Sequence, residues 1–234
     1  MYDYKKRIID DILKEKVECK GAILIEGPKW CGKTTSAEQI SKSILYMANP
    51  RLLKQNLMLA DSNPEILLRG ETPRLIDEWQ IAPKLWDAVR FEVDQRKNFG
   101  QFILTGSAVP ADISEIIHTG TGRFTFVKMR PMSLVESGES NGSVSLEKLF
   151  NDDNNIYGES MLSLDDIAFL VCRGGWPIAT YLKGKSALSQ AIDYYDAVVN
   201  YDISRADNVK RDSEKVKKIM ASYARNQGTQ ISDE

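Results

Sequence analysis

The chain contains the stretch Gly27-Pro28-Lys29-Trp30-Cys31-Gly32-Lys33-Thr34, which matches the pattern G-x-x-x-x-G-K-[ST] at every fixed position. The short apolar run before it, Ala22–Ile25, predicts a buried strand. Apolar residues at helical spacing predict a helix from Gly32 to about Met47. A strand, a glycine turn and a helix in this order are typical of a phosphate-binding loop in an α/β sheet.

The chemistry of this loop follows from its backbone. Glycines allow successive N–H groups to point at one anion, and the start of a helix also favours negative charge. Lys33 is expected to reach the outer phosphates of a nucleotide, and Thr34 to bind Mg²⁺. We therefore expect ATP and Mg²⁺ to bind here. The expected nucleotide contacts are Gly27, Pro28, Lys29, Trp30, Cys31, Gly32, Lys33, Thr34 and Thr35.

Two acids follow another apolar run. The stretch Arg74-Leu75-Ile76-Asp77-Glu78 predicts a strand, and it has the pattern of a Walker B motif. Asp77 could help to bind Mg²⁺, while Glu78 could orient or deprotonate the attacking water. A strand that simply ends in solvent is the alternative. Ligands of open α/β sheets bind at the carboxyl ends of strands, so both acids are expected to face Lys33.

Further elements complete the expected sheet. Strands are predicted at Asn56–Ala60 and Gln101–Leu104, and a helix at about Pro83–Arg96. Thr105 and Ser107 follow the second of these strands, where a hydroxyl could hydrogen-bond the γ-phosphate or the attacking water. A plain Thr-Gly-Ser turn is the alternative.

Composition narrows the classes of protein. Of the 234 residues, 42% are hydrophobic and 27% are charged, which is typical of a globular protein. The net charge of -2 gives no overall basic field. The cysteines at Cys19, Cys31 and Cys172 are too scattered for a disulfide framework or a zinc site. No apolar run approaches the roughly 18 residues that span a bilayer. We expect a cytoplasmic protein with no membrane partner.

The chain has a single histidine, His118, beside the turn-like Thr119–Gly122. A loop position is therefore predicted for it. One histidine also excludes most serine and cysteine hydrolase triads. The chemistry must rely on carboxylates, lysine, arginine and a metal.

These motifs together resemble the bacterial and archaeal AAA-type P-loop ATPases that carry a C-terminal domain of unknown function. The resemblance rests on residues 27–35, 74–80 (RLIDEWQ), 102–107 (FILTGS), 122–123 (GR), 130–134 (RPMSL) and 174–177 (GGWP). It implies a three-layer α/β/α core and a small helical lid. The parallel sheet would have about five strands, with the strand before Thr105 between the P-loop strand and the strand before Asp77.

The resemblance also implies a role for Arg123. Its guanidinium would stabilise charge on the transferring phosphoryl group, as an arginine finger or a sensor arginine. It could act in its own chain or in a neighbouring copy of a homo-oligomer. A surface arginine that enters the predicted strand Phe124–Met129 is the alternative.

Three regions are predicted. Residues 1–135 form the ATPase core with an N-terminal helix at about Tyr4–Leu13, residues 136–160 a polar linker, and residues 161–234 the helical lid with the start of a further region. Helices beyond the core are predicted at about Leu146–Phe150, Leu164–Cys172, Ser186–Ser204 and Val209–Asn226. Ser232–Glu234 reads as a helix start, so we expect a fragment of a longer protein.

The last of these helices concentrates basic residues. They are Lys210, Arg211, Lys215, Lys217, Lys218 and Arg225. A solvated amphipathic helix is the favoured explanation, and DNA contact through Lys210–Arg225 is the other. The sequence indicates no particular protein or nucleic-acid partner.

Three functions stay open. A Mg-dependent ATP hydrolase that moves its lid and a partner is favoured. A nucleotide-dependent switch or scaffold with negligible turnover is the second, and a small-molecule kinase the third. Glu78 directly after Asp77 favours activation of water over transfer of the phosphoryl group to a metabolite.

Cys31 has its own prediction. The start of a helix, with Lys29 and Lys33 nearby, would lower its thiol pKa, so that it reacts readily and nucleotide protects it. A thiol buried against the sheet as a small apolar group is the alternative.

Overall fold

The structure is a computed structural model that describes residues 3–106, 116–151, 157–205 and 209–229. Its core is a five-stranded sheet in the order β2-β3-β4-β1-β5, with every neighbouring pair parallel. The strands are β1 (Ala22–Glu26), β2 (Ser43–Tyr46), β3 (Arg74–Asp77), β4 (Phe102–Gly106) and β5 (Phe124–Lys128). The α/β fold is confirmed, and so is the place of the strand before Thr105, between the P-loop strand and the strand that ends at Asp77.

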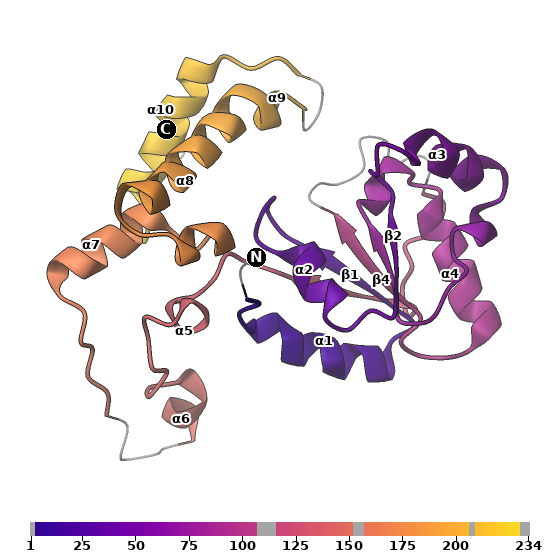
Figure 1. Cartoon of the computed structure of the whole chain (residues 1–234), viewed down its shortest axis with the longest axis horizontal. Helices are drawn as coiled ribbons and strands as arrows, with labels where there is room; N and C mark the ends of the chain where they lie inside the picture. Colours follow the sequence, from indigo (N-terminus) through magenta and orange to yellow (C-terminus); the bar gives the residue numbers. More distant parts are fainter. Residues whose placement is uncertain (1–2, 107–115, 152–156, 206–208, 230–234) are drawn as a thin grey trace.

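Helices cover both faces of this sheet (Figure 1). The α-helices are α1 (Ile8–Cys19), α2 (Lys33–Glu38), α3 (Leu53–Ser62), α4 (Leu85–Arg96), α5 (Leu134–Ser137), α6 (Leu146–Phe150), α7 (Leu164–Arg173), α8 (Gly184–Ala197), α9 (Ile203–Arg205) and α10 (Ser213–Arg225). Short 3-10 helices are η1 (Pro64–Ile66), η2 (Trp79–Ile81) and η4 (Pro177–Tyr181), and η5 (Val198–Asp202) is a π-helix.

The layers follow from the two-residue period of the strands. Leu24 and Leu104 point to the face covered by α3 and α4 and join one apolar core. Ile25 and Ile103 point to the face covered by α1 and α2 and join a second core. Because successive side chains of a strand point to opposite faces, an apolar strand fills both cores at once. The result is the three-layer arrangement expected from the resemblance.

Two predicted elements of the core were wrong. The helix predicted from Gly32 to Met47 ends at Glu38, and residues 43–46 form the edge strand β2. Its apolar residues fit a helical spacing by chance, whereas its alternating exposure is that of a strand paired on one side. The strand predicted at Asn56–Ala60 is part of helix α3. Leucine, methionine and alanine favour helices there, and the buried Asn56 side chain donates to the carbonyl of Tyr46.

The N-terminal helix begins later than predicted. Residues 3–7 are not helical, and α1 starts at Ile8, where the backbone N–H of Arg7 donates to Asp10 Oδ2 at 2.8 Å. The extended segment leaves Tyr4 and Arg7 free to contact the core. This segment becomes part of the candidate site described below.

Beyond β5 the chain runs away from the sheet into a helical region (Figure 1). The helix predicted at Leu146–Phe150 is confirmed, and α7 ends at Arg173, with Gly174 (φ +70°) as its C-cap. The ring of Trp176 lies 4.1 Å from that of Tyr194 and also packs against the core beneath α1. The helical region therefore touches the core near the P-loop. The boundaries at residues 135 and 160 stay predictions, and Ser232–Glu234 lies outside the described residues.

Candidate functional site

The loop between β1 and α2 is shaped by its two glycines. Gly27 has φ +158° and Gly32 has φ +100°, which are conformations that favour glycine. A Cβ at Gly27 would also lie only 2.2 Å from the carbonyl oxygen of Met129. Trp30, at the tip, has φ +65° and is 69% exposed. The path of the loop thus depends on the glycines that the motif requires.

The side chain of Lys33 lies inside this loop. Its Nζ donates to the carbonyls of Gly27 at 2.9 Å and Pro28 at 2.8 Å, and the residue is only 6% exposed. Burial lowers the pKa of Lys33 from its ordinary value. The ammonium is held at the loop by neutral carbonyls, which phosphate oxygens could replace as stronger acceptors.

A hydroxyl from helix α2 and one from strand β4 meet at the carboxylate of Asp77, the last residue of β3. Thr34 Oγ1 and Thr105 Oγ1 each donate to Asp77 Oδ1 at 2.7 Å. The register explains the second bond, because Asp77 pairs with Thr105 across β3 and β4. Parallel strands therefore bring together the residues that the sequence placed at separate strand ends.

The oxygens at Asp77 suit a hard cation such as Mg²⁺, which binds through one or two protein oxygens with phosphate and water as further ligands. Within the described residues, no group of three or more His, Cys, Asp and Glu could hold a metal. A cation at Thr34 and Asp77 would therefore take further ligands from a bound phosphate and water.

Glu78 follows Asp77 in an unusual backbone conformation. Its φ is +57°, in the left-handed region, and it is the N-cap of η2. Gln80 Nε2 donates to Glu78 Oε2. Gln80 Oε1 is buried and has no hydrogen-bond partner among the described residues. The Glu78 carboxylate is thus held by a neighbour whose other amide atom is available for a bond.

These groups line one large cavity. Its volume is about 1280 Å³, and its walls come from the P-loop, Glu78 and Gln80, the N-terminal residues 3–7, and η4. Asp77 lies one hydrogen bond behind this wall, through Thr34. The cavity is large enough for a nucleotide.

Sequence reasoning missed the N-terminal wall of this cavity. Tyr4 OH lies 2.7 Å from Asp10 Oδ1 and 2.8 Å from Ser36 Oγ, and burial raises its pKa. Arg7 is 4% exposed and donates to the carbonyl of Cys31 in the P-loop. The contacts with Ser36 and Cys31 join distant segments, and no local pattern indicates them.

Comparison with known proteins places this site in a family. The AAA domain family matches residues 20–137, which include the P-loop, β3 and β4. The chain belongs to this AAA domain family. No curated protein sequence matches the chain.

The fold of this AAA domain is also found in a solved structure. The Walker-type ATPase PABY2304 of Pyrococcus abyssi aligns over 99% of this chain and 86% of its own, with a TM-score of 0.50 and 14% identity. A RuvB variant from Thermotoga maritima aligns over 92% of this chain and 66% of its own, with a TM-score of 0.38 and 19% identity. PCH-2 of C. elegans aligns over 85% and 61%, with a TM-score of 0.31 and 15% identity.

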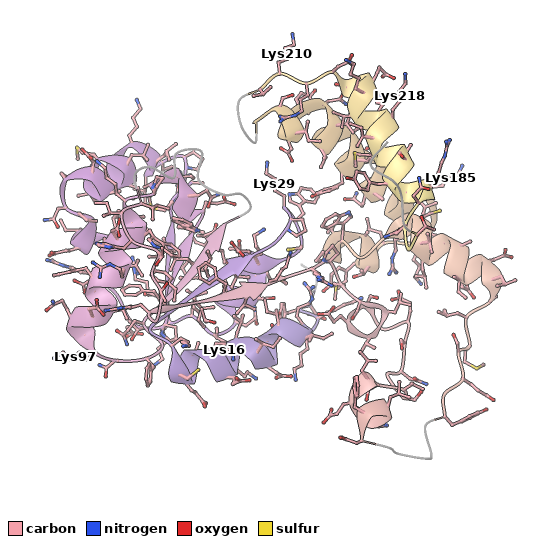
Figure 2. The ribbon with its side chains drawn as sticks, turned by 180° about the vertical axis from the view of Figure 1, so that it is seen from behind. Lys16, Lys29, Lys97, Lys185, Lys210 and Lys218 are labelled. Carbon is pink, nitrogen blue, oxygen red and sulfur yellow. The ribbon has the colours of Figure 1, made fainter. Side chains whose placement is uncertain are left out.

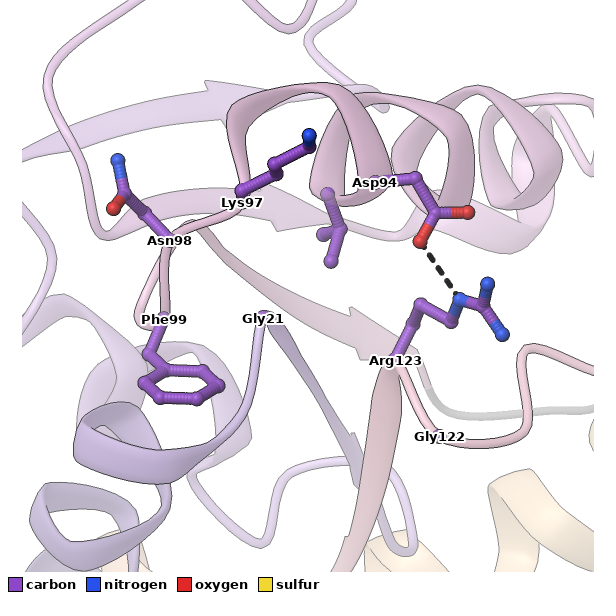
Figure 3. A pocket seen from close by; sticks show the side chains of 8 residues that line it. Gly21, Asp94, Lys97, Asn98, Phe99, Gly122 and Arg123 are labelled. Atoms are coloured by element: carbon purple, nitrogen blue, oxygen red, sulfur yellow. Dashed lines mark hydrogen bonds and ion pairs between the residues drawn. The ribbon is translucent and has the colours of Figure 1, made fainter.

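Arg123 lies far from the nucleotide loop of this AAA domain. It comes just before β5 and accepts a backbone bond from Ala22 at the start of β1, whereas the P-loop follows the end of β1. Its Nε donates to Asp94 Oδ1 at 2.8 Å, beside a hollow of about 330 Å³ (Figure 3). A finger or sensor role toward its own nucleotide is therefore wrong, since the two lie at opposite edges of a parallel sheet. A role in a neighbouring copy stays a prediction.

The prediction for Cys31 was also wrong. Its side chain is fully buried in the core beneath α1, and burial raises the pKa of the thiol despite the nearby charges of Lys33 and Arg7. The structure instead agrees with the alternative interpretation, in which the thiol of Cys31 packs against the sheet as a small apolar group. Cys31 contributes only its backbone to the loop.

Lys29 joins the P-loop to the helical region. Its Nζ lies 2.6 Å from Asp202 Oδ1 at the end of η5. Figure 2 shows Lys29 on the side of the core that faces the C-terminal helices. A nucleotide that draws Lys29 toward its phosphates would therefore weaken this link.

The other predicted positions have simpler outcomes. Ser107 lies outside the described residues, and His118 lies in a loop, as expected. Along α10 the basic residues are mostly exposed, as Lys218 is in Figure 2. Lys217 pairs with Glu214 at 3.0 Å. DNA contact by α10 stays a prediction. None of the helices in the described parts of the chain is long and apolar enough to cross a membrane.

Proposed function

We propose that this AAA domain binds Mg-ATP and hydrolyses it. The observation that carries the proposal is the meeting of Thr34 and Thr105 at one oxygen of Asp77, beside the loop that holds Lys33. This arrangement joins a phosphate-binding loop to a cation-binding carboxylate, and Glu78 follows directly.

Lys33 is the group proposed to bind the outer phosphates. Its present acceptors are two loop carbonyls, and charged phosphate oxygens are better acceptors for an ammonium. The left-handed glycines leave loop N–H groups available to the same phosphates. Binding would then exchange neutral partners for charged ones without rebuilding the loop.

Thr34 and Asp77 are proposed to hold Mg²⁺ between the protein and the phosphates. The hydroxyl and the carboxylate are already 2.7 Å apart, so two oxygens are prearranged for one cation. When bound, Mg²⁺ would neutralise charge that develops on the phosphoryl oxygens. Thr105, bonded to the same Asp77 oxygen, is proposed to orient the γ-phosphate or the water.

Glu78 is proposed to activate the attacking water. Its carboxylate lines the cavity and is held by Gln80, which limits the orientations that it can take. A carboxylate fixed near the phosphates lowers the entropic cost of positioning water. A switch with negligible turnover would bind nucleotide identically and differ at this step alone.

The nucleoside is proposed to lie toward the N-terminal segment and η4. This end of the cavity carries Tyr4, Tyr181, Pro177 and Ile178, whose apolar and aromatic surfaces suit a base. Because one wall belongs to the core and the other to the proposed lid, residues 161–234, binding would tie the two together. Loss of phosphate after hydrolysis would loosen them and move the lid.

Calorimetry and phosphate release test the proposal together. Mg-ATP should bind the purified chain, Mg²⁺ chelation should weaken binding, and Asp77→Asn should remove the advantage that Mg²⁺ gives. Steady phosphate release should accompany binding. Binding without release would favour the switch, and formation of ADP and a phosphorylated acceptor, without free phosphate and only when an acceptor is added, would favour a kinase. Absence of Mg-ATP binding would reject the site.

A further inference from the structure

Arg7 connects the P-loop to the segment that follows β5, although it lies outside the matched residues 20–137. Its Nη1 donates to the carbonyl of Cys31 at 2.7 Å, and its Nη2 to the carbonyl of Arg130 at 2.8 Å. Its Nε donates to Glu136 Oε1 at 2.9 Å. One planar guanidinium therefore bonds to three residues that lie 24 to 129 positions away along the chain.

The ion pair that holds Arg7 is itself fixed. Glu136 accepts backbone bonds from Ile8 at 2.8 Å and Ser133 at 2.7 Å. Burial opposes ionisation of Glu136, but these bonds and Arg7 outweigh it and lower its pKa. The side chains of Arg7 and Glu136 are 5% and 7% exposed. A pair this buried gains little net stability over an apolar pair, so stability alone is a weak explanation for it.

The bond to Cys31 has a geometric consequence for the P-loop. In a trans peptide the carbonyl and the next N–H point in opposite directions. Arg7 draws the Cys31 carbonyl toward itself, so the N–H of Gly32 points away from Arg7. The guanidinium also lies close to the loop, because a Cβ at Gly32 would be 3.2 Å from Arg7 Nη1. Both residues line the large cavity.

We propose that Arg7 is a positioning residue that fixes the Cys31–Gly32 peptide so that the Gly32 N–H faces the nucleotide phosphates. This inference rests on the proposed function, because it presumes that phosphates occupy the loop. It adds a residue from the N-terminal segment to the phosphate site.

Two Arg7 variants and a matched control test the proposal. Arg7→Lys keeps the charge, but its single ammonium cannot reach the carbonyls of Cys31 and Arg130 together. Arg7→Met removes every side-chain donor. Lys6→Met is the control, since Lys6 is an exposed neighbour whose partner is Asp11. Hydrogen exchange of the peptide that covers residues 27–34, in protein without nucleotide, measures how well the backbone amides of the loop are protected. Calorimetry measures the effect of each variant on the affinity for Mg-ATP.

Arg7→Lys should raise exchange in the loop, leave exchange in β3 and β4 as in the parent, and weaken ATP binding about tenfold or more. Lys6→Met should change neither. If Arg7→Met fails to fold, Arg7→Lys still tests the positioning role of Arg7. Loop exchange and ATP affinity equal to the parent in Arg7→Lys would overturn the positioning role, as would faster exchange spread evenly over the chain. Altered loop exchange in a chain that binds no ATP would reject the proposed function and keep the role of Arg7 in the loop.

Discussion

Lys29 Nζ and Asp202 Oδ1 lie 2.6 Å apart, although 173 residues separate them in the sequence. Lys29 belongs to the nucleotide loop, and Asp202 ends the π-helix η5 in the helical region. Single π-helical turns occur often at functional sites. Nucleotide phosphates and Asp202 would attract the same ammonium. If the proposed function holds, this pair would couple the state of the nucleotide to the position of the helical region.

Asp202→Asn should strengthen binding of Mg-ATP, because Lys29 would no longer be held by a carboxylate. The pair is partly exposed, and such pairs contribute little, so the gain should be about two- to fivefold and should shrink in high salt. Calorimetry at low and high salt measures it. Asp193→Asn, at an exposed position of α8, should leave the affinity unchanged. Weaker binding by Asp202→Asn would contradict the coupling.

Lys33→Ala should reduce ATP affinity by at least about tenfold, because the phosphates lose a charged donor that the loop already holds in place. Lys54→Ala, an exposed position on α3, is the matched control. Titration calorimetry compares the two. Equal affinities would place the nucleotide elsewhere. The melting temperature checks that Lys33→Ala is folded.

Glu78→Gln should keep ATP affinity within about twofold and lower phosphate release by a factor on the order of a hundred or more, because the carboxylate acts on water rather than on bound nucleotide. Glu65→Gln, at an exposed position in η1, should behave as the parent. Single-turnover phosphate release separates the chemical step from product release. A variant that loses binding and turnover together would show that Glu78 holds the nucleotide instead.

Cys31 should resist alkylation in the folded protein, while the exposed Cys19 and Cys172 react. Burial raises the pKa of Cys31, so its thiolate should form only at a higher pH than that of an ordinary cysteine thiol. The stability contributed by the neutral thiol is present below the ordinary thiol pKa and is lost as pH rises through the higher folded value. N-ethylmaleimide labelling mapped by mass spectrometry should give at least about tenfold slower modification of Cys31 at neutral pH. Labelling as fast as at Cys172 would contradict this burial.

Local patterns account for the correct part of the sequence prediction. The P-loop from Gly27 to Thr34 and the acids after Ile76 are contiguous motifs whose geometry is fixed by a strand and the turn that follows. The order of β1, β3 and β4 came from the resemblance. By contrast, β2 was mistaken for a helix because its apolar positions fit both periods, and only pairing with β3 selects the strand.

Contacts between distant segments account for the rest. Arg123 stands before a strand, and the edge of the sheet that it reaches depends on the parallel pairing of β5 with β1. Arg7 and Tyr4 find their partners on the P-loop, α2 and the chain beyond β5, so no window of sequence contains the signal. Asp202 reaches Lys29 only because the helical region folds back on the core.

Because all five strands are parallel, their carboxyl ends share the edge of the sheet that carries the P-loop, and their amino ends share the opposite edge. The turn at Lys97–Gly100 lies at the second, where Lys97 has φ +53° and Phe99 is 64% exposed. Its neighbours Gly21 and Arg123 line the hollow in Figure 3, away from the P-loop. A tag, a fluorophore or an inserted peptide at Asn98 would thus lengthen a surface turn without displacing Lys33, Asp77 or Glu78. This turn is therefore a position at which the folded domain can be immobilised or labelled while the P-loop stays accessible.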